Sequence, residues 1–153
     1  MVNGGTFISP TLVKKSVSKL GPRIISKKVS ARLRSMLRDV VDKPEGTANL
    51  GKVVGYSVGG KTGTAEKISK TGGYDAERVL ATFASFFPSE DPKYVLIITL
   101  DEPEDRMGRE PRRTAGYTAV PVAAEVIRRV APLLGLTPKV KELLNKDLAL
   151  TNE

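Results

Sequence analysis

The sequence predicts an α+β fold in which an antiparallel sheet of about three strands is flanked by helices. Apolar residues recur with helical spacing over residues 30–42 and 121–134, whereas residues 60–67, 78–87 and 94–100 have the composition of strands. The segments between these strands are too short to hold a crossover helix, so neighbouring strands should run antiparallel. Because such a sheet is thin, we expect its second face and its edge to need covering.

The first half of the chain should contain one short extended segment and one helix. Residues 6–13 are extended in character, but Pro10 restricts them to an edge strand or a loop. Residues 30–42 form the helix, which Pro44 ends, and residues 43–51 are a connector rich in turn formers. The apolar stripe predicted for this helix consists of Leu33, Met36, Leu37, Val40 and Val41.

Residues 52–58 and 60–67 should be extended on either side of the Gly59-Gly60 pair. A loop at residues 69–74 leads to the strand 78–87, and a turn at residues 88–93 leads to the strand 94–100, whose continuous apolar run is typical of a sheet interior. Residues 101–113 are too charged to be regular.

A second helix is predicted over residues 121–134, closed by Gly135. Residues 137–153 should form a short helix over residues 140–150 or a polar tail. The side chains expected on the core face of the second helix are Val122, Ala123, Val126, Ile127 and Val130.

The composition excludes several kinds of chemistry. The 153-residue chain has no cysteine and no histidine, which rules out disulfides, thiolate nucleophiles, Ser-His-Asp catalysis and histidine metal ligation. Any general base must be Lys, Glu, Asp or Tyr, and we expect neither a metal nor a cofactor. No apolar run approaches the ~20 residues of a membrane span, and the first residues lack the features of a signal peptide.

The net charge of +8 is concentrated near the start, where nine basic residues precede the first acid, Asp39. Proteins that bind single-stranded nucleic acids interleave such charges with aromatic rings, and here only Phe7 lies among them. We therefore expect a solvated or membrane-proximal basic face and no nucleic acid. A basic module that binds an anionic polymer or partner through residues 14–38 remains the alternative.

The residues that bear most directly on chemistry are those from Gly59 to Lys67, which contain Lys61-Thr62-Gly63-Thr64. In a strand, Thr62 and Thr64 share one face, and Gly63 leaves room for a ligand to approach the backbone. Lys-Thr-Gly is one of three motifs of serine acyl-transferases such as penicillin-binding proteins, the others being Ser-x-x-Lys and a Ser-Asp-Asn type triplet.

The same region also satisfies the P-loop pattern G-x-x-x-x-G-K-[ST], from Gly55 to Thr62. A P-loop requires a helix after the lysine, so that the amides and the helix dipole surround the phosphates. Gly63 and Gly72-Gly73 leave no room for such a helix, so a nucleotide hydrolase is only the third hypothesis.

Several segments together resemble one family. They are residues 1–10, Gly46-Thr47-Ala48, residues 59–67 and Phe83 to Pro88, and in this order they resemble the C-terminal part of a class B penicillin-binding protein, a peptidoglycan DD-transpeptidase. The resemblance implies an incomplete portion of the transpeptidase domain at residues 1–136, with residues 137–153 as a tail.

The resemblance also implies roles for the motif. Lys61 and Thr64 would be catalytic, Lys61 through its charge and Thr64 through a backbone N–H in the oxyanion hole. Thr62, Gly63 and Thr64 would bind the substrate, and the two hydroxyls would form hydrogen bonds with its carboxylate. Glu66 is read as a solvated strand residue and receives no role.

Two of the three motifs are missing. The only Ser-x-x-Lys, from Ser16 to Lys19, is followed by Gly21-Pro22, which prevents a helix, and Thr47-Ala48-Asn49 is read as connector. We therefore expect a fragment that is inactive alone and needs an upstream portion carrying the nucleophile. Its parent would be anchored on the periplasmic side of the bacterial inner membrane, where it crosslinks peptidoglycan stem peptides and binds β-lactams.

Overall fold

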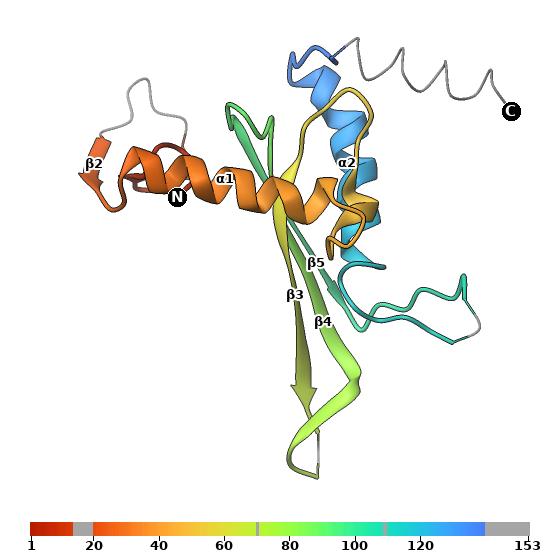
Figure 1. Cartoon of the computed structure of the whole chain (residues 1–153). Coiled ribbons are helices and arrows are strands. Elements are labelled where there is room, and N and C mark those ends of the chain that lie inside the picture. Colours follow the sequence, from red (N-terminus) through yellow and green to blue (C-terminus); the bar gives the residue numbers. More distant parts are fainter. Residues whose placement is uncertain (14–19, 70, 109, 140–153) are drawn as a thin grey trace, which may run out of the picture.

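The computed structural model describes residues 1–13, 20–69, 71–108 and 110–139 (Figure 1). Its elements are β1 (Thr6–Ile8), β2 (Leu20–Arg23), α1 (Lys27–Asp42), the 3₁₀ helix η1 (Asn49–Gly51), β3 (Gly59–Ile68), β4 (Tyr74–Phe87), β5 (Tyr94–Asp101) and α2 (Ala119–Leu133). Strands β1 and β2 form a small antiparallel sheet. Strand β2 was not predicted, because it contains Gly21 and Pro22, and glycine and proline are depleted in strands.

The main sheet is the predicted antiparallel meander, in the order β3-β4-β5. The hairpin of β3 and β4 extends well beyond the helices, as Figure 1 shows in yellow to green. Strand β4 begins at Tyr74, four residues before the predicted start, because Gly72 and Gly73 turn the chain with positive φ values of 94° and 78°. The loop between β3 and β4 is therefore shorter than predicted.

Helix α1 begins three residues before the predicted start. Ser26 is its N-cap and accepts a hydrogen bond from the Val29 amide, so the helix includes a polar first turn that apolar spacing does not reveal. Of the predicted stripe, Val41 is buried and Met36 is 65% exposed. The first half of α1 extends beyond the main sheet toward the small β1–β2 sheet (Figure 1).

Helix α2 packs with a face that partly matches the predicted one: Ala123 and Ile127 are buried, and Val130 packs against the core. The other buried residues are Ala119, Val120 and Ala131, while Val122 is 41% exposed. Small alanine side chains on this face allow the helix to approach the sheet closely. Gly135, with a φ of 75°, ends the helix as predicted.

The strand predicted over residues 52–58 is wrong. Gly55 has a φ of 83°, and the Tyr56 amide donates to the Val53 carbonyl, so the chain makes a tight turn here. The Gly55 backbone in turn contacts the end of the described chain, because its carbonyl accepts from the Lys139 amide.

One face of the sheet carries the core. Val41 of α1 and Ile127 of α2 join Phe83 and Ala81 of β4 in one buried cluster, so both helices cover this face, as predicted. On the other face, Val95 and Ile97 of β5 are 68% and 61% exposed. The apolar run of β5 therefore does not lie in the sheet interior: β5 is an edge strand, covered on one face.

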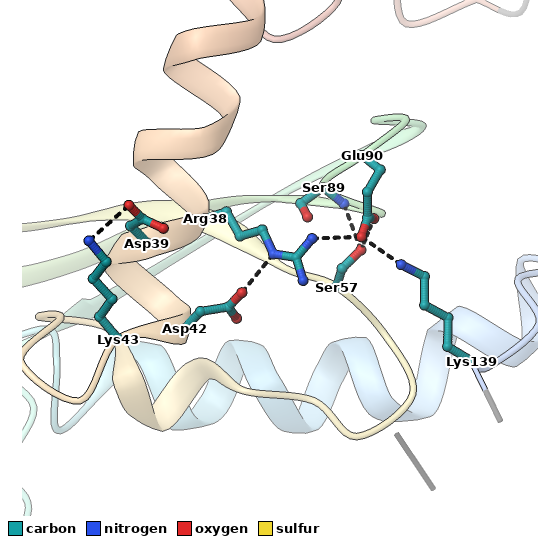
Figure 2. A network of polar contacts seen from close by, with 8 residues as sticks. All are labelled: Arg38, Asp39, Asp42, Lys43, Ser57, Ser89, Glu90 and Lys139. Carbon is teal, nitrogen blue, oxygen red and sulfur yellow. Dashed lines mark hydrogen bonds and ion pairs between the residues drawn. The ribbon is translucent and has the colours of Figure 1, made fainter. Parts of the chain in front are cut away.

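A polar network centred on Glu90 connects three parts of the chain (Figure 2). The Glu90 carboxylate accepts hydrogen bonds from Arg38 of α1, from Ser57 and from Lys139 near the end of the described chain. Burial raises the pKa of Glu90, but the hydrogen bonds from Lys139 and Ser57 outweigh it and lower the pKa to about 2. The carboxylate thus stays charged at neutral pH and holds the three segments together.

Candidate functional site

A cavity of about 460 Å³ lies beside β3. Three segments enclose it: the connector after α1, the middle of β3, and the residues just before α2. Five of its lining residues carry a hydroxyl, and Glu45 is the one carboxylate among them. The lining residues are Pro44, Glu45, Gly46, Thr47, Asn49, Thr62, Thr64, Thr114, Ala115, Gly116 and Tyr117.

Strand β3 places Thr62 and Thr64 at the cavity. They pair with Phe83 and Ala81 of β4 and therefore lie on the face of the sheet that carries the core. Because β3 is an edge strand, the two threonines sit where this face meets open space. The structure thus brings together the two hydroxyls that the sequence placed on one face.

Lys61 and Gly63 point to the opposite face and are not among the residues that line this cavity. The Lys61 ammonium nevertheless folds back along the strand edge, where it donates to the Thr62 carbonyl at 2.8 Å and to Thr62 Oγ1 at 3.4 Å. At Gly63, an added Cβ would meet no heavy atom within 4 Å. The motif therefore places a cation beside the hydroxyls and leaves open space at its glycine.

The connector after α1 contributes Thr47, whose Oγ1 lies 2.9 Å from Oγ1 of Thr62. The next residue, Ala48, is fully buried, and its amide donates to the Val40 carbonyl of α1. At Gly46, an added Cβ would lie 2.2 Å from that same carbonyl oxygen. Only glycine allows the connector to fold back so tightly and to present Thr47 to β3.

The residues before α2 form the third wall. The Ala115 amide donates to Thr64 Oγ1 at 3.1 Å, and an added Cβ at Gly116 would lie 2.6 Å from the Thr47 carbonyl oxygen. The second and third walls therefore touch each other as well as β3. The Thr62 hydroxyl is thus positioned by Thr47 and Lys61, and the Thr64 hydroxyl by the Ala115 amide.

An aromatic ring borders the cavity. Tyr117 is stacked by the guanidinium of Arg112, whose central carbon lies 4.0 Å from the ring centroid. Arg112 is held by Asp105. The hydrogen bond from the Met107 amide lowers the pKa of the Asp105 carboxyl, burial opposes this effect, and the hydrogen bond from Arg112 lowers the pKa further. This arrangement orients the ring at the cavity rim.

Chemically, the site suits a small anion. Two neighbouring hydroxyls supply hydrogen-bond donors to the cavity, and the Lys61 ammonium lies beside Thr62 at the strand edge. Within the described residues, no group of three Asp or Glu side chains is arranged to hold a metal ion. Over the same residues, no helix is long and apolar enough to cross a membrane.

The P-loop hypothesis does not fit this geometry. Lys61 and Thr62 lie inside β3, which continues as a strand to Ile68, so no helix N-terminus faces a phosphate site here. Among the basic residues of the alternative binding module, Arg23 and Arg34 donate to backbone carbonyls, and Arg38 is engaged by Asp42 and Glu90. The Ser16 and Lys19 loop lies outside the described residues.

Sequence reasoning identified Thr62 and Thr64 but missed two contributors, Thr47 and Ala115. Thr47 had been noticed only as part of the Gly46-Thr47-Ala48 connector, and nothing distinguished Ala115. Both reach the cavity through tertiary packing, for which a periodic pattern carries no signal.

Comparison with known proteins places this architecture among cell-wall enzymes. Residues 1–128 match the family model of the penicillin binding protein transpeptidase domain. Stage V sporulation protein D of Bacillus subtilis is 34% identical over 157 aligned residues, which cover 95% of this chain and 23% of that protein. The probable peptidoglycan D,D-transpeptidase FtsI of Caulobacter vibrioides is 35% identical, over 92% of this chain and 25% of that protein.

The solved structures agree. The transpeptidase domain of penicillin-binding protein 3 from Burkholderia pseudomallei superposes with a TM-score of 0.75 at 30% identity, covering 90% of this chain and 40% of that one. The chain thus spans about a quarter of the length of the curated relatives it matches.

Proposed function

The chain belongs to the penicillin-binding protein transpeptidase domain family, and on that basis we propose that it forms one wall of the active site of a peptidoglycan D,D-transpeptidase. The enzyme crosslinks stem peptides through an acyl-serine intermediate and is acylated by β-lactams. The observation that carries the proposal is the pair of hydroxyls, Thr62 and Thr64, presented side by side to a cavity next to the Lys61 ammonium.

Each residue of the motif receives a role in acyl transfer. Thr62 and Thr64 donate their hydroxyl protons to the substrate carboxylate, and Lys61 adds positive charge beside them. Gly63 leaves space for the substrate to approach the strand. The backbone N–H of Thr64 stabilises the oxyanion that develops on the attacked carbonyl, an interaction worth about 3 kcal/mol of barrier in enzymes of this chemistry.

The strand edge supports the oxyanion role. The Thr62 carbonyl accepts a hydrogen bond from the Lys61 side chain, which favours a carbonyl directed away from β4. Backbone groups of residues two apart in a strand point the same way, so the N–H of Thr64 would also face outward. An N–H in that direction is free to meet an oxyanion.

The nucleophilic serine is proposed to come from an upstream portion of the same protein, anchored on the periplasmic side of the bacterial inner membrane. The open face of the sheet is where this portion would pack, because Val95 and Ile97 on β5 are exposed and β5 has a free edge. The matching part of the Burkholderia transpeptidase domain is likewise only 40% of that chain.

A labelling experiment tests the proposal. We expect the full-length protein to form a covalent adduct with a fluorescent penicillin, and the isolated 153-residue chain to form none. Lys61→Ala should lower the labelling rate of the full-length protein at least about a hundredfold, the loss typical of one electrostatic group in acyl transfer. Lys93→Ala, an exposed lysine in the β4–β5 turn paired with Asp91, is the control and should label normally.

Two results would contradict the proposal. Labelling of the isolated chain would place a nucleophile within it, and an undiminished rate for Lys61→Ala would remove Lys61 from the mechanism.

A further inference from the structure

The function proposed above does not use Thr47, although its side chain makes a specific contact at the cavity. Oγ1 of Thr47 lies 2.9 Å from Oγ1 of Thr62, and either hydroxyl can donate in this pair. The two residues come from different segments, the connector after α1 and strand β3. What the contact does depends on which oxygen provides the proton.

A hydroxyl has one proton and can accept two hydrogen bonds. If Thr62 donated to Thr47, it would have no proton left for a substrate carboxylate. If Thr47 donates, the proton of Thr62 remains available to an acceptor in the cavity. The Lys61 ammonium, 3.4 Å from Thr62 Oγ1, can only donate, so it too favours Thr62 as an acceptor on the protein side.

Thr64 provides an internal comparison. Its Oγ1 accepts from the Ala115 amide at 3.1 Å, and an amide can only donate, so this hydrogen bond leaves the proton of Thr64 unused. With Thr47 as the donor to Thr62, both threonines would be arranged alike. The hydroxyl oxygen of each would accept from a donor on an opposing wall, and both hydroxyl protons would be left for one carboxylate.

The position of Thr47 is set by close backbone packing on both sides. Gly46 lies against the Val40 carbonyl and Gly116 against the Thr47 carbonyl, in each case too closely for a Cβ. The connector therefore cannot shift away from β3 without moving α1 or the segment before α2. This packing holds the Thr47 hydroxyl at Thr62.

We propose that Thr47 is a positioning residue, whose hydroxyl donates to Thr62 Oγ1 and so directs the Thr62 proton toward the substrate carboxylate. The inference rests on the proposed function, because it presupposes that Thr62 binds that carboxylate. It assigns to the Gly46-Thr47-Ala48 connector a role in recognition of the carboxylate.

The test uses the full-length protein and a fluorescent penicillin, with the acylation rate resolved into the dissociation constant of the initial complex and the rate of the covalent step. Thr47→Val keeps the shape and removes the hydroxyl, and it should raise the dissociation constant about tenfold, the effect of one hydrogen bond to an ionised partner. The covalent step should change by less than about threefold, and Thr47→Ser should restore binding to within about twofold.

Two further measurements separate positioning from a general structural defect. With the methyl ester of the penicillin, which has no carboxylate, Thr47→Val should behave like the unaltered protein. In a protein that already carries Thr62→Val, adding Thr47→Val should cause no further loss.

Equal binding by the unaltered protein and Thr47→Val would overturn the proposal, as would equal losses for Thr47→Val and Thr47→Ser. An equal loss with the ester would also overturn the proposal, as would additive losses in the double variant. These two outcomes count in the same way for a variant whose melting temperature is lowered. If the unaltered full-length protein is not labelled at all, the proposed function itself fails, which is a distinct outcome.

Discussion

Replacing Glu90 with glutamine tests whether the polar network of Figure 2 holds together the three segments that it connects. The substitution keeps the size of the side chain and one acceptor oxygen but removes the charge. Arg38 and Lys139 then lose their ion pairs with this residue, and Ser57 loses a charged acceptor. These partners lie in α1, in the segment after the Gly55 turn and near the end of the described chain.

The size of the effect follows from the pKa of Glu90. A fall from 4.5 to about 2 corresponds to about 3 kcal/mol of preferential stabilisation of the charged form in the folded state. The Glu90 side chain is 42% exposed, so solvent screening reduces this value, and we expect a loss of about 1–2 kcal/mol. A loss of this size raises the population of the locally open state about five- to thirtyfold.

Hydrogen exchange read by mass spectrometry measures that opening in the full-length protein. The informative peptide contains Ser89, whose amide donates to both the carbonyl and the hydroxyl of Ser57. Its exchange should accelerate in Glu90→Gln, together with the C-terminal half of α1.

Glu125→Gln is the matched control. Hydrogen bonds from Arg128 and Arg129 also lower the pKa of Glu125 to about 2, but all three residues lie on the solvent side of α2 and connect no other element. Exchange near Ser89 should be unchanged in this variant. If Glu90→Gln behaves like Glu125→Gln, the reasoning about the network is refuted.

The remaining predictions concern pH and two of the glycines of β3, Gly60 and Gly63. Because the pKa of Glu90 is lowered on folding, its contribution to stability is complete above pH ~4.5 and is lost as the pH falls toward ~2. The difference in hydrogen exchange between the unaltered protein and Glu90→Gln should therefore shrink between pH ~6 and pH ~3. A constant difference would contradict this prediction. Gly60→Ala places a Cβ 2.6 Å from the Phe83 ring and should lower the unfolding free energy by about 2 kcal/mol in a urea titration. Gly63→Ala meets no atom within 4 Å, so it should unfold normally yet label more slowly with penicillin; a destabilised Gly63→Ala or a stable Gly60→Ala would show that the packing is misjudged.

The sheet could be predicted from sequence because its signals are local. Strand composition, two short turns and the absence of room for crossover helices sufficed for the β3-β4-β5 meander. The errors arose where a single backbone conformation or a neighbour decides the outcome. The positive φ of Gly55 turned an expected strand into a turn, and close packing of Ala119, Val120 and Ala131 shifted the buried face of α2 away from Val122.

The candidate site divides in the same way. Strand periodicity alone put Thr62 and Thr64 on one face, and the structure keeps them there. Nothing local predicts that Thr47 reaches Thr62 or that the Ala115 amide reaches Thr64, because those contacts depend on how α1 and α2 pack against the sheet. The roles of Lys61, Thr62, Gly63 and Thr64 stay predictions.

The way the three walls meet bears on how an incomplete domain can still present an ordered binding surface. Gly46 allows the connector to pack against the Val40 carbonyl of α1, and Gly116 allows the segment before α2 to pack against the Thr47 carbonyl, at distances that no Cβ would permit. Backbone contacts therefore hold these two walls of the cavity in place. Backbone bracing loses little entropy when a ligand binds, because few rotamers remain to be fixed. In the proposed transpeptidase, contacts within this chain would thus organise the carboxylate-binding side of the cleft, and an upstream portion would supply the nucleophile and cover the open sheet face.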